Sequence, residues 1–178
     1  ATPWKGDTAA AHKDYIAFST PSTMPGDLNY AEIVGWLSDN LPENSVITNG
    51  AGNYTVWVHR FFRYKQYATQ LAPQSGAMGY GVPSGVSAGV RQHDREVVSF
   101  SGDRGLPMHC PETGTGDQHN AKVIFIVVNN GMYGTIRMHQ ETHYPKRKSA
   151  TDLVNPDFAA FARAYGAPGE TVTKTGDF

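Results

Sequence analysis

Two runs of apolar and β-branched residues, at 96–101 and 123–128, are the clearest hydrophobic segments of the chain. Runs without polar alternation are typical of parallel strands that are buried on both faces. A shorter run predicts a strand at 45–48, an extended piece is expected near 67–71, and a last strand is predicted at 170–173. Helices are expected between these segments, near 29–40, 79–90, 134–140 and 156–165. The alternation predicts an α/β fold with a parallel sheet sandwiched by helices.

The first 25 residues have a different character and are predicted to be a connector. Pro3, Pro21 and Pro25 lie among Ser, Thr and Ala residues, around one possible short helix near 9–18. A globular domain is predicted to begin at residue 26. Asp27 is the expected N-cap of the helix over 29–40.

Composition narrows the class of protein. A length of 178 residues suits one hydrophobic core, and a formal net charge of −1 gives no reason to expect nucleic acid or an anionic membrane as a partner. The single cysteine, Cys110, excludes a disulfide within the chain, and no secretory signal or membrane-spanning run is visible. We therefore expect a cytoplasmic protein. Charged residues make up 17%, a low share that suits large surfaces buried against other protein.

Polar residues follow both clear strands. Gly102 and Asp103 end the first run, and Asn129 and Asn130 end the second, with room for one crossover helix between them. A carboxylate and an amide oxygen at neighbouring strand ends can hold one hard cation, and that cation can hold a diphosphate. The sequence therefore predicts a magnesium-diphosphate clamp. Taken singly, Asp103 could instead cap a helix, and the Asn pair could form a turn.

A glycine-rich turn, Gly50-Ala51-Gly52, follows the predicted strand at 45–48. Without side chains, its backbone amides can approach phosphate oxygens, and a helix starting after it would add a positive dipole end. Gly52, Asn53 and Tyr54 are the predicted diphosphate contacts from this turn. An ordinary strand-to-helix connection is the alternative interpretation.

Four ordered blocks, at 48–54, 75–81, 101–103 and 127–134, together resemble the diphosphate-binding domain of thiamine-diphosphate enzymes, in particular the acetolactate synthase-like group. That group includes carboligases, 2-oxo acid decarboxylases and related oxidases, and the resemblance covers residues 26–178. It implies thiamine diphosphate and Mg²⁺ as cofactors, with Asp103, Asn130 and the Met132 carbonyl as metal ligands. The cofactor-binding residues that it implies are Gly50, Gly52, Asn53, Tyr54, Gly76, Met78, Gly102, Asp103, Arg104, Gly105, Asn130, Met132, Tyr133 and Gly134.

The resemblance gives Met78 and Gly76 particular roles. Met78 would lie beneath the bent cofactor, between its two rings, and the Gly76 carbonyl would accept from the cofactor's amino group. A polarizable thioether suits that position, although a methionine judged without the resemblance is more often a core residue. His139 and Gln140, after the metal loop, are weaker candidates for facing a substrate.

The resemblance also implies what the chain lacks. The family's activating glutamate belongs to a separate pyrimidine-binding domain that these 178 residues do not contain, so no catalytic residue is predicted here. The domain is expected to be incomplete at its C-terminus and inactive alone. A 2-oxo acid substrate, a pyrimidine-binding partner domain and a homo-oligomeric full-length enzyme are the implied partners. Two other interpretations stay open: an α/β nucleotide-phosphate-binding module, and a non-catalytic structural or interaction domain.

One segment departs from the family pattern. Arg104 stands where the family has glycine, and residues 104–117 contain two prolines and three glycines, so we expect no regular helix there. The departure puts phosphate contacts at Arg104 and Gly105 in question. His109 and Cys110 fall in the same segment, but no ligand spacing supports a metal or nucleophile role for them. The distance along the chain from Asp103 to Asn130 is the one that the family has, although residues 104–117 differ. We therefore hypothesise that two compensating shifts of the reading frame in the coding DNA produced residues 104–117.

The mass of the tryptic peptide that ends at Lys122 tests this hypothesis. If the hypothesis is right, the measured mass of this peptide will differ from the mass calculated from the sequence, while the masses of the flanking peptides will agree with it. A matching mass, together with an intact coding frame, would refute the hypothesis.

Overall fold

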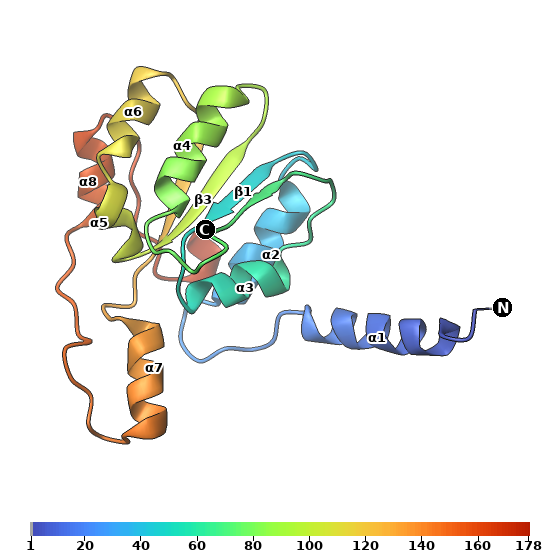
Figure 1. Ribbon diagram of the computed structural model, residues 1–178. Helices are drawn as coiled ribbons and strands as arrows, with labels where there is room; N and C mark the ends of the chain where they lie inside the picture. Colours follow the sequence, from blue (N-terminus) through green and yellow to red (C-terminus); the bar gives the residue numbers. More distant parts are fainter. Residues whose placement is uncertain (1) are drawn as a thin grey trace. The chain divides into compact units, whose positions relative to one another are not determined.

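The computed structural model of the protein describes residues 2–178, which fall into two compact units (Figure 1). One unit contains the described residues up to Asn40, together with Trp57–Arg63 and Val172–Phe178. The other contains Leu41–Val56 and Tyr64–Thr171, and it holds the sheet and every candidate site residue. The predicted division between a connector at 1–25 and a domain at 26–178 stays a prediction.

A four-stranded parallel sheet with the order β2-β1-β3-β4 organises the larger unit. Its strands are β1 (Val46–Asn49), β2 (Gln70–Leu71), β3 (Val97–Gly102) and β4 (Val123–Val128). The predicted parallel sheet is confirmed. The strand predicted at 123–128 has those bounds in the structure, and the strands predicted at 96–101 and 45–48 each begin and end one residue later. The extended piece expected near 67–71 forms a shorter strand. β1 is buried throughout and β3 nearly so, whereas β4, at the sheet's edge, leaves Ile124 50% exposed. Continuous apolar runs therefore marked the strands correctly.

The helices of this unit include α4 (Gly81–Arg91), α5 (Gly105–His109), α6 (Glu112–Gln118), α7 (Gly134–His143) and α8 (Phe158–Ala164). Of these, α4 and α5 contact the sheet. α4 packs directly on the sheet, because a Cβ at Gly89 would lie only 2.8 Å from the Val123 side chain. The Gly81 carbonyl accepts hydrogen bonds from the Thr48 and Ser99 hydroxyls, which joins the first turn of α4 to β1 and β3.

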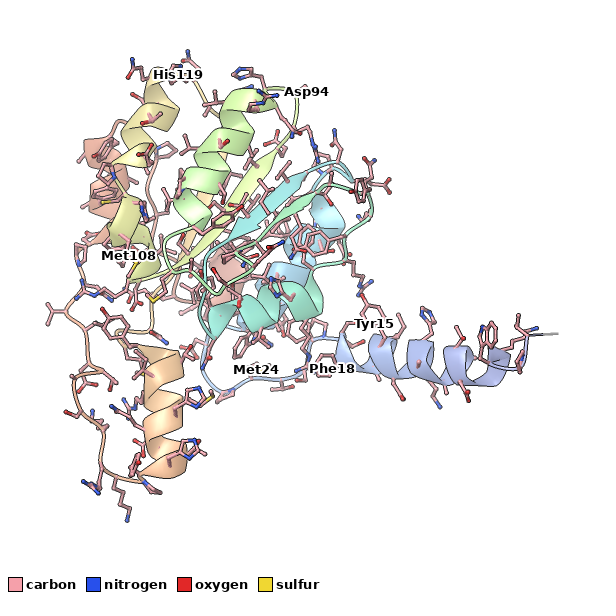
Figure 2. All side chains as sticks on the ribbon, in the orientation of Figure 1. Tyr15, Phe18, Met24, Asp94, Met108 and His119 are labelled. Atoms are coloured by element: carbon pink, nitrogen blue, oxygen red, sulfur yellow. The ribbon has the colours of Figure 1, made fainter. Side chains whose placement is uncertain are left out.

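The smaller unit contains α1 (Lys5–Phe18), α2 (Tyr30–Asn40), the last turns of α3 (Tyr54–Phe61) and η1 (Thr175–Asp177). The helix expected near 9–18 therefore starts earlier, at Lys5. None of its residues is buried, and Tyr15 and Phe18 can be located on it in Figure 2. The predicted cap at Asp27 is wrong: the Asn29 side chain accepts from the Ala31 amide, because it lies directly before the helix.

Two further expectations are corrected. The described residues 170–173 form neither helix nor strand. The segment 104–117, expected to be non-helical, forms α5 and α6 with a break at Cys110 and Pro111. Pro107 lies in the first turn of α5 and Pro111 at the N-cap of α6, positions whose amide hydrogens have no partner within a helix. Within the described residues, no helix is long and apolar enough to cross a membrane.

Phe100 lies in the middle of the sheet and is 0% exposed. Truncation in Phe100→Ala should lower the free energy of unfolding by about 3–5 kcal/mol, because it removes buried apolar area and leaves a cavity. Urea unfolding followed by circular dichroism measures the loss. The control Tyr67→Ala, at a residue that is 100% exposed, should change stability by less than about 0.5 kcal/mol. Similar losses in both variants would contradict this assignment of the core.

Candidate diphosphate and metal site

Three loops meet at the carboxyl edge of the sheet. They follow β1 at Gly50, β3 at Asp103 and β4 at Asn129. From β1 the chain moves to β2 on one side and then crosses to β3 on the other, so β1 and β3 flank a topological switch point. In open parallel sheets, ligands bind in the crevice outside the carboxyl ends of strands at such a point.

Asp103 is a buried acidic residue at the carboxyl edge of the sheet, with 5% of its surface exposed. Its Oδ2 atom accepts from the Gly131 amide and from Asn155 Nδ2, both at 2.8 Å. Across the described residues, no basic side chain forms an ion pair with Asp103. A buried carboxylate that has only neutral donors lacks charge compensation, which is costly. A bound cation fits this surrounding.

The loop after β4 is built from side-chain turns. Asn130 Oδ1 accepts from the Met132 amide at 3.1 Å, and Asn129 Oδ1 accepts from the Gly131 amide at 3.2 Å. Gly131 has φ +68°, a conformation that glycine adopts readily. Asp103 contacts this loop directly through Gly131, so the structure brings the three predicted metal ligands onto adjacent loops.

The backbone hydrogen bonds between this loop and residues 151–153 do not use the Met132 carbonyl oxygen, which is therefore available to a ligand. Met132 forms an isolated antiparallel bridge with Asp152, in which the Tyr133 amide donates to Thr151 and the Leu153 amide donates to Gly131. The bridge thus uses the neighbours of Met132 and not its own carbonyl oxygen. Because the described residues contain no group of three His, Cys, Asp or Glu side chains suited to a metal, a cation here would have one carboxylate and neutral oxygens as ligands. Magnesium held jointly by protein and phosphate accepts such a set.

The glycines of the β1 and β3 loops enclose the Tyr54 ring. A Cβ at Gly50 would lie 2.8 Å from Tyr54 Oη, and at Gly52 and Gly102 it would lie 3.0 Å and 3.1 Å from ring carbons. The Gly50 amide donates to the Phe100 carbonyl, so that amide is already used within the sheet edge. Glycine is therefore needed at these positions for packing as well as for any phosphate.

Tyr54 itself stays neutral at ordinary pH. Burial raises the pKa of its phenol to about 12, and hydrogen bonds from the Gly102 and Gly50 backbone only partly oppose this effect. A neutral phenol does not repel an anionic group. The neighbouring Asn53 accepts from Thr135 Oγ1 at 2.8 Å, which joins the β1 loop to α7 just beyond Tyr133 and Gly134.

The turn at 75–81 lies in the same unit but is not bonded to the Asp103 loops. Gly76 is exposed with φ +66°, and Met78 is half-buried. Gly79 packs beneath α5, since a Cβ there would lie 2.5 Å from His109 Nδ1 and 3.1 Å from Met108 Cβ. No hydrogen bond in the described part of the chain connects Gly76 or Met78 with Asp103.

Arg104 occupies the N-cap position of α5, directly after Asp103. Its Nε atom is buried and has no hydrogen-bond partner among residues 2–178. The following Gly105 is also buried. An unpartnered guanidinium N–H beside the switch point suits an anionic ligand such as phosphate.

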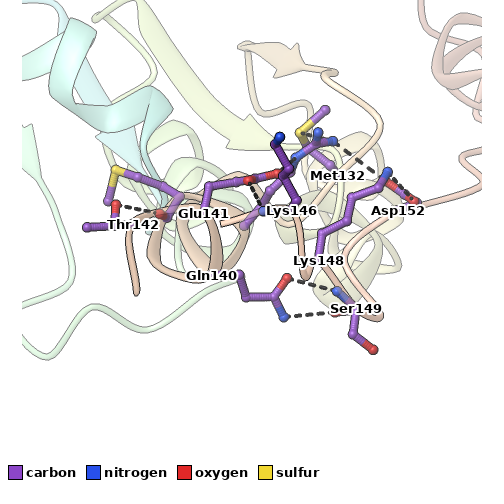
Figure 3. A network of polar contacts seen from close by, with 10 residues as sticks. Met132, Gln140, Glu141, Thr142, Lys146, Lys148, Ser149 and Asp152 are labelled. Atoms are coloured by element: carbon purple, nitrogen blue, oxygen red, sulfur yellow. Dashed lines mark hydrogen bonds and ion pairs between the residues drawn. The ribbon is translucent and has the colours of Figure 1, made fainter. Parts of the chain in front are cut away.

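The weaker candidates on α7 have other contacts. Gln140 bonds Ser149 through both ends of its amide, Nε2 to the carbonyl and Oε1 to the amide, as the dashed lines in Figure 3 show. His139 stacks on His143, with ring centroids 6.3 Å apart. Facing a substrate stays a prediction for His139 and Gln140. The sequence reasoning missed Asn155 as a partner of this edge, and only a contact across many residues could have revealed it.

The fold and these loops define a parallel α/β domain with a buried carboxylate and a glycine-rich turn at its switch point. The family model described as "Thiamine pyrophosphate enzyme, C-terminal TPP binding domain" matches residues 50–178. The chain belongs to this family, whose cofactor is thiamine diphosphate and whose usual partner metal is Mg²⁺.

Acetolactate synthases are among the relatives of this chain. The chain is 32% identical over 158 residues to the acetolactate synthase large subunit of Parasynechococcus marenigrum, a match that covers 86% of this chain and 25% of the relative. It is 31% identical over 153 residues to the Escherichia coli isozyme 2 large subunit, covering 84% of this chain and 28% of that protein. The chain thus spans about a quarter of the length of these relatives.

A solved structure agrees on the fold. The Rhodococcus jostii thiamine diphosphate-dependent 4-hydroxybenzoylformate decarboxylase superposes with a TM-score of 0.81 at 23% sequence identity. The match covers 90% of this chain and 31% of the decarboxylase chain. At this identity the likeness shows the thiamine-diphosphate-binding fold alone.

The raised pKa of Tyr54 makes stability depend on alkaline pH. An unfolded tyrosine ionises near 10.0 and the folded Tyr54 near 12, so Tyr54's contribution is complete below pH 10 and is lost as the pH rises towards 12. Between about pH 9 and about pH 11.5, Tyr54→Phe should lose about 2 kcal/mol less stability than the unmodified protein, because most of the roughly 3 kcal/mol that corresponds to a shift of two pKa units is lost in this range. Urea unfolding at about pH 9 and about pH 11.5 measures the difference. The exposed control Tyr67→Phe should keep the unmodified slope, and an unchanged slope in Tyr54→Phe would contradict the burial of its phenol.

Proposed function

We propose that this chain is the thiamine-diphosphate- and Mg²⁺-binding domain of an acetolactate synthase-like carboligase or decarboxylase that acts on a 2-oxo acid. Asp103 carries the proposal: it is a buried carboxylate, without an ion pair among residues 2–178, at the switch point of a domain whose family binds this cofactor.

In this proposal, Asp103, Asn130 Oδ1 and the Met132 carbonyl hold Mg²⁺. Two phosphate oxygens and a water would complete the six oxygens that Mg²⁺ prefers. Gly52, Asn53 and Tyr54 would contact the diphosphate from the β1 loop.

The remaining loops complete the proposed cofactor site. Gly102, Arg104 and Gly105 would contact the diphosphate from the β3 side, and Tyr133 and Gly134 from the start of α7. Gly76 and Met78 would contact the rest of the cofactor. The bound cofactor supplies the electron sink for decarboxylation of a 2-oxo acid, and this chain's residues bind and orient it.

Catalysis is proposed to need a pyrimidine-binding domain that the chain does not contain, and the full-length enzyme is proposed to be a homo-oligomer. We therefore propose no catalytic residue in this chain and no turnover by it alone. The cytoplasmic location stays a prediction from the sequence. The alternative of a nucleotide-phosphate-binding module loses support because the family to which the chain belongs binds thiamine diphosphate.

Isothermal titration of thiamine diphosphate into the chain, with and without Mg²⁺, tests this function. Binding should require the metal, and Asp103→Ala should weaken it by on the order of 100-fold or more, because the only anionic ligand is removed. The exposed Asp94, labelled in Figure 2, offers a matched control: Asp94→Ala removes the same charge away from the site and should bind normally. Equal binding by Asp103→Ala would overturn the proposed clamp. No binding by the unmodified chain would favour a non-catalytic interaction domain.

A further inference from the structure

A side chain outside all the recognised blocks reaches the centre of the site. Asn155 lies 52 positions after Asp103, and its Nδ2 atom donates to Asp103 Oδ2 at 2.8 Å and to Asn129 Oδ1 at 2.9 Å. One amide group therefore bridges the loop after β3 and the loop after β4. We infer that Asn155 is a positioning residue that orients the Asp103 carboxylate towards the metal, an inference that rests on the proposed function.

The chemistry of the contact fixes the orientation of the amide. Asp103 and Asn129 both present oxygen acceptors, and only the Nδ2 end of Asn155 carries hydrogens. Reversing the amide would set its oxygen against two other oxygens. The Oδ1 atom of Asn155 consequently points away from these two acceptors; it is buried and has no hydrogen-bond partner in the described part of the chain. That orphaned acceptor suits a site that takes up water or another hydrogen-bond donor with its ligand.

Asn155 acts on only one of the two carboxylate oxygens. Together with the Gly131 amide it places two donors on Asp103 Oδ2. No hydrogen bond to Oδ1 occurs among the described residues, so this oxygen is available for a cation. Two donors on one oxygen stop the carboxylate from rotating, and the free oxygen needs no reorganisation to bind metal. Partners that orient a ligand in this way typically contribute 10–100-fold to metal affinity.

Backbone pairing of the preceding residues positions Asn155 beside Asp103. Residues 151–155, which we call the return segment, pair antiparallel with the metal loop through Tyr133 to Thr151 and Leu153 to Gly131, both at 2.9 Å. The Lys148 ammonium lies 2.9 Å from the carboxylate of Asp152 in this segment, and both residues are labelled in Figure 3. This ion pair is exposed to solvent, so it contributes little to holding the segment. The metal loop is therefore held by β3 on one side and by the return segment on the other.

The competing explanation is that Asn155 only fastens the return segment. Under that explanation its loss would loosen the whole edge and weaken every ligand alike. A positioning role instead predicts a defect specific to the metal. The two are separated by measuring Mg²⁺ affinity and metal-free diphosphate binding on the same variant.

The experiment compares the unmodified 178-residue chain with Asn155→Ala and Lys148→Ala. Lys148→Ala is the matched control, because it removes an exposed ion pair of the adjoining loop without touching Asp103. Mg²⁺ is titrated calorimetrically in the presence of thiamine diphosphate, and inorganic diphosphate is titrated without metal. Thermal melting confirms that each variant is folded.

Asn155→Ala should bind Mg²⁺ about 10–100-fold more weakly, bind metal-free diphosphate as the unmodified chain does, and regain full cofactor binding at saturating Mg²⁺. Lys148→Ala should match the unmodified chain in every titration. Unchanged Mg²⁺ affinity in Asn155→Ala would overturn the inference and leave the proposed function standing, and so would an equal loss of metal and diphosphate binding. Absence of metal-dependent binding in the unmodified chain would overturn both.

Discussion

The parallel pairing of β3 with β4 is the constraint on which the site depends. Their register runs from Val97 opposite Val123 to Gly102 opposite Val128, and the Asp103 amide continues it by donating to the Val128 carbonyl. Because β3 is buried almost throughout, a slip of one residue would turn its core side chains to the opposite face. The same slip would separate Asp103 from the Gly131 amide. The hydrophobic core and the site geometry are thus set by one register.

The β1 loop depends on a second constraint, the place of the Tyr54 ring. Gly50 and Gly52 follow β1 and Gly102 ends β3, yet a Cβ at any of them would lie only 2.8–3.1 Å from the Tyr54 side chain. Glycines near a proposed phosphate site are usually explained by the approach of the ligand. Here they also let an aromatic residue pack between two strand ends, which fixes the distance between the loops without any ligand.

Much of this arrangement could be predicted from the sequence, and the reasons are local. The hydrophobic runs at 96–101 and 123–128 marked β3 and β4, and the rule that parallel strands share a carboxyl edge brought Asp103 close to Asn130. The failures are equally specific. Asp27 and Asn29 are both good caps, and only the true first turn decides between them. No regular helix was expected over residues 104–117, yet two short helices form there because the prolines fall at helix starts. Asn155 had no local signal at all, since its partners lie far away in the sequence.

The unusual segment 104–117 affects the two halves of the proposed clamp differently. The donors that hold Asp103 are the Gly131 amide and Asn155, and its own amide donates to Val128, so the cation side is built entirely outside that segment. The segment nevertheless packs: Leu106 is 4% exposed. On the phosphate side, Arg104 brings a positive charge where the family's glycine brings only an open backbone. A change confined to this segment would therefore alter the proposed contacts with the diphosphate while the donors that hold Asp103 stay in place.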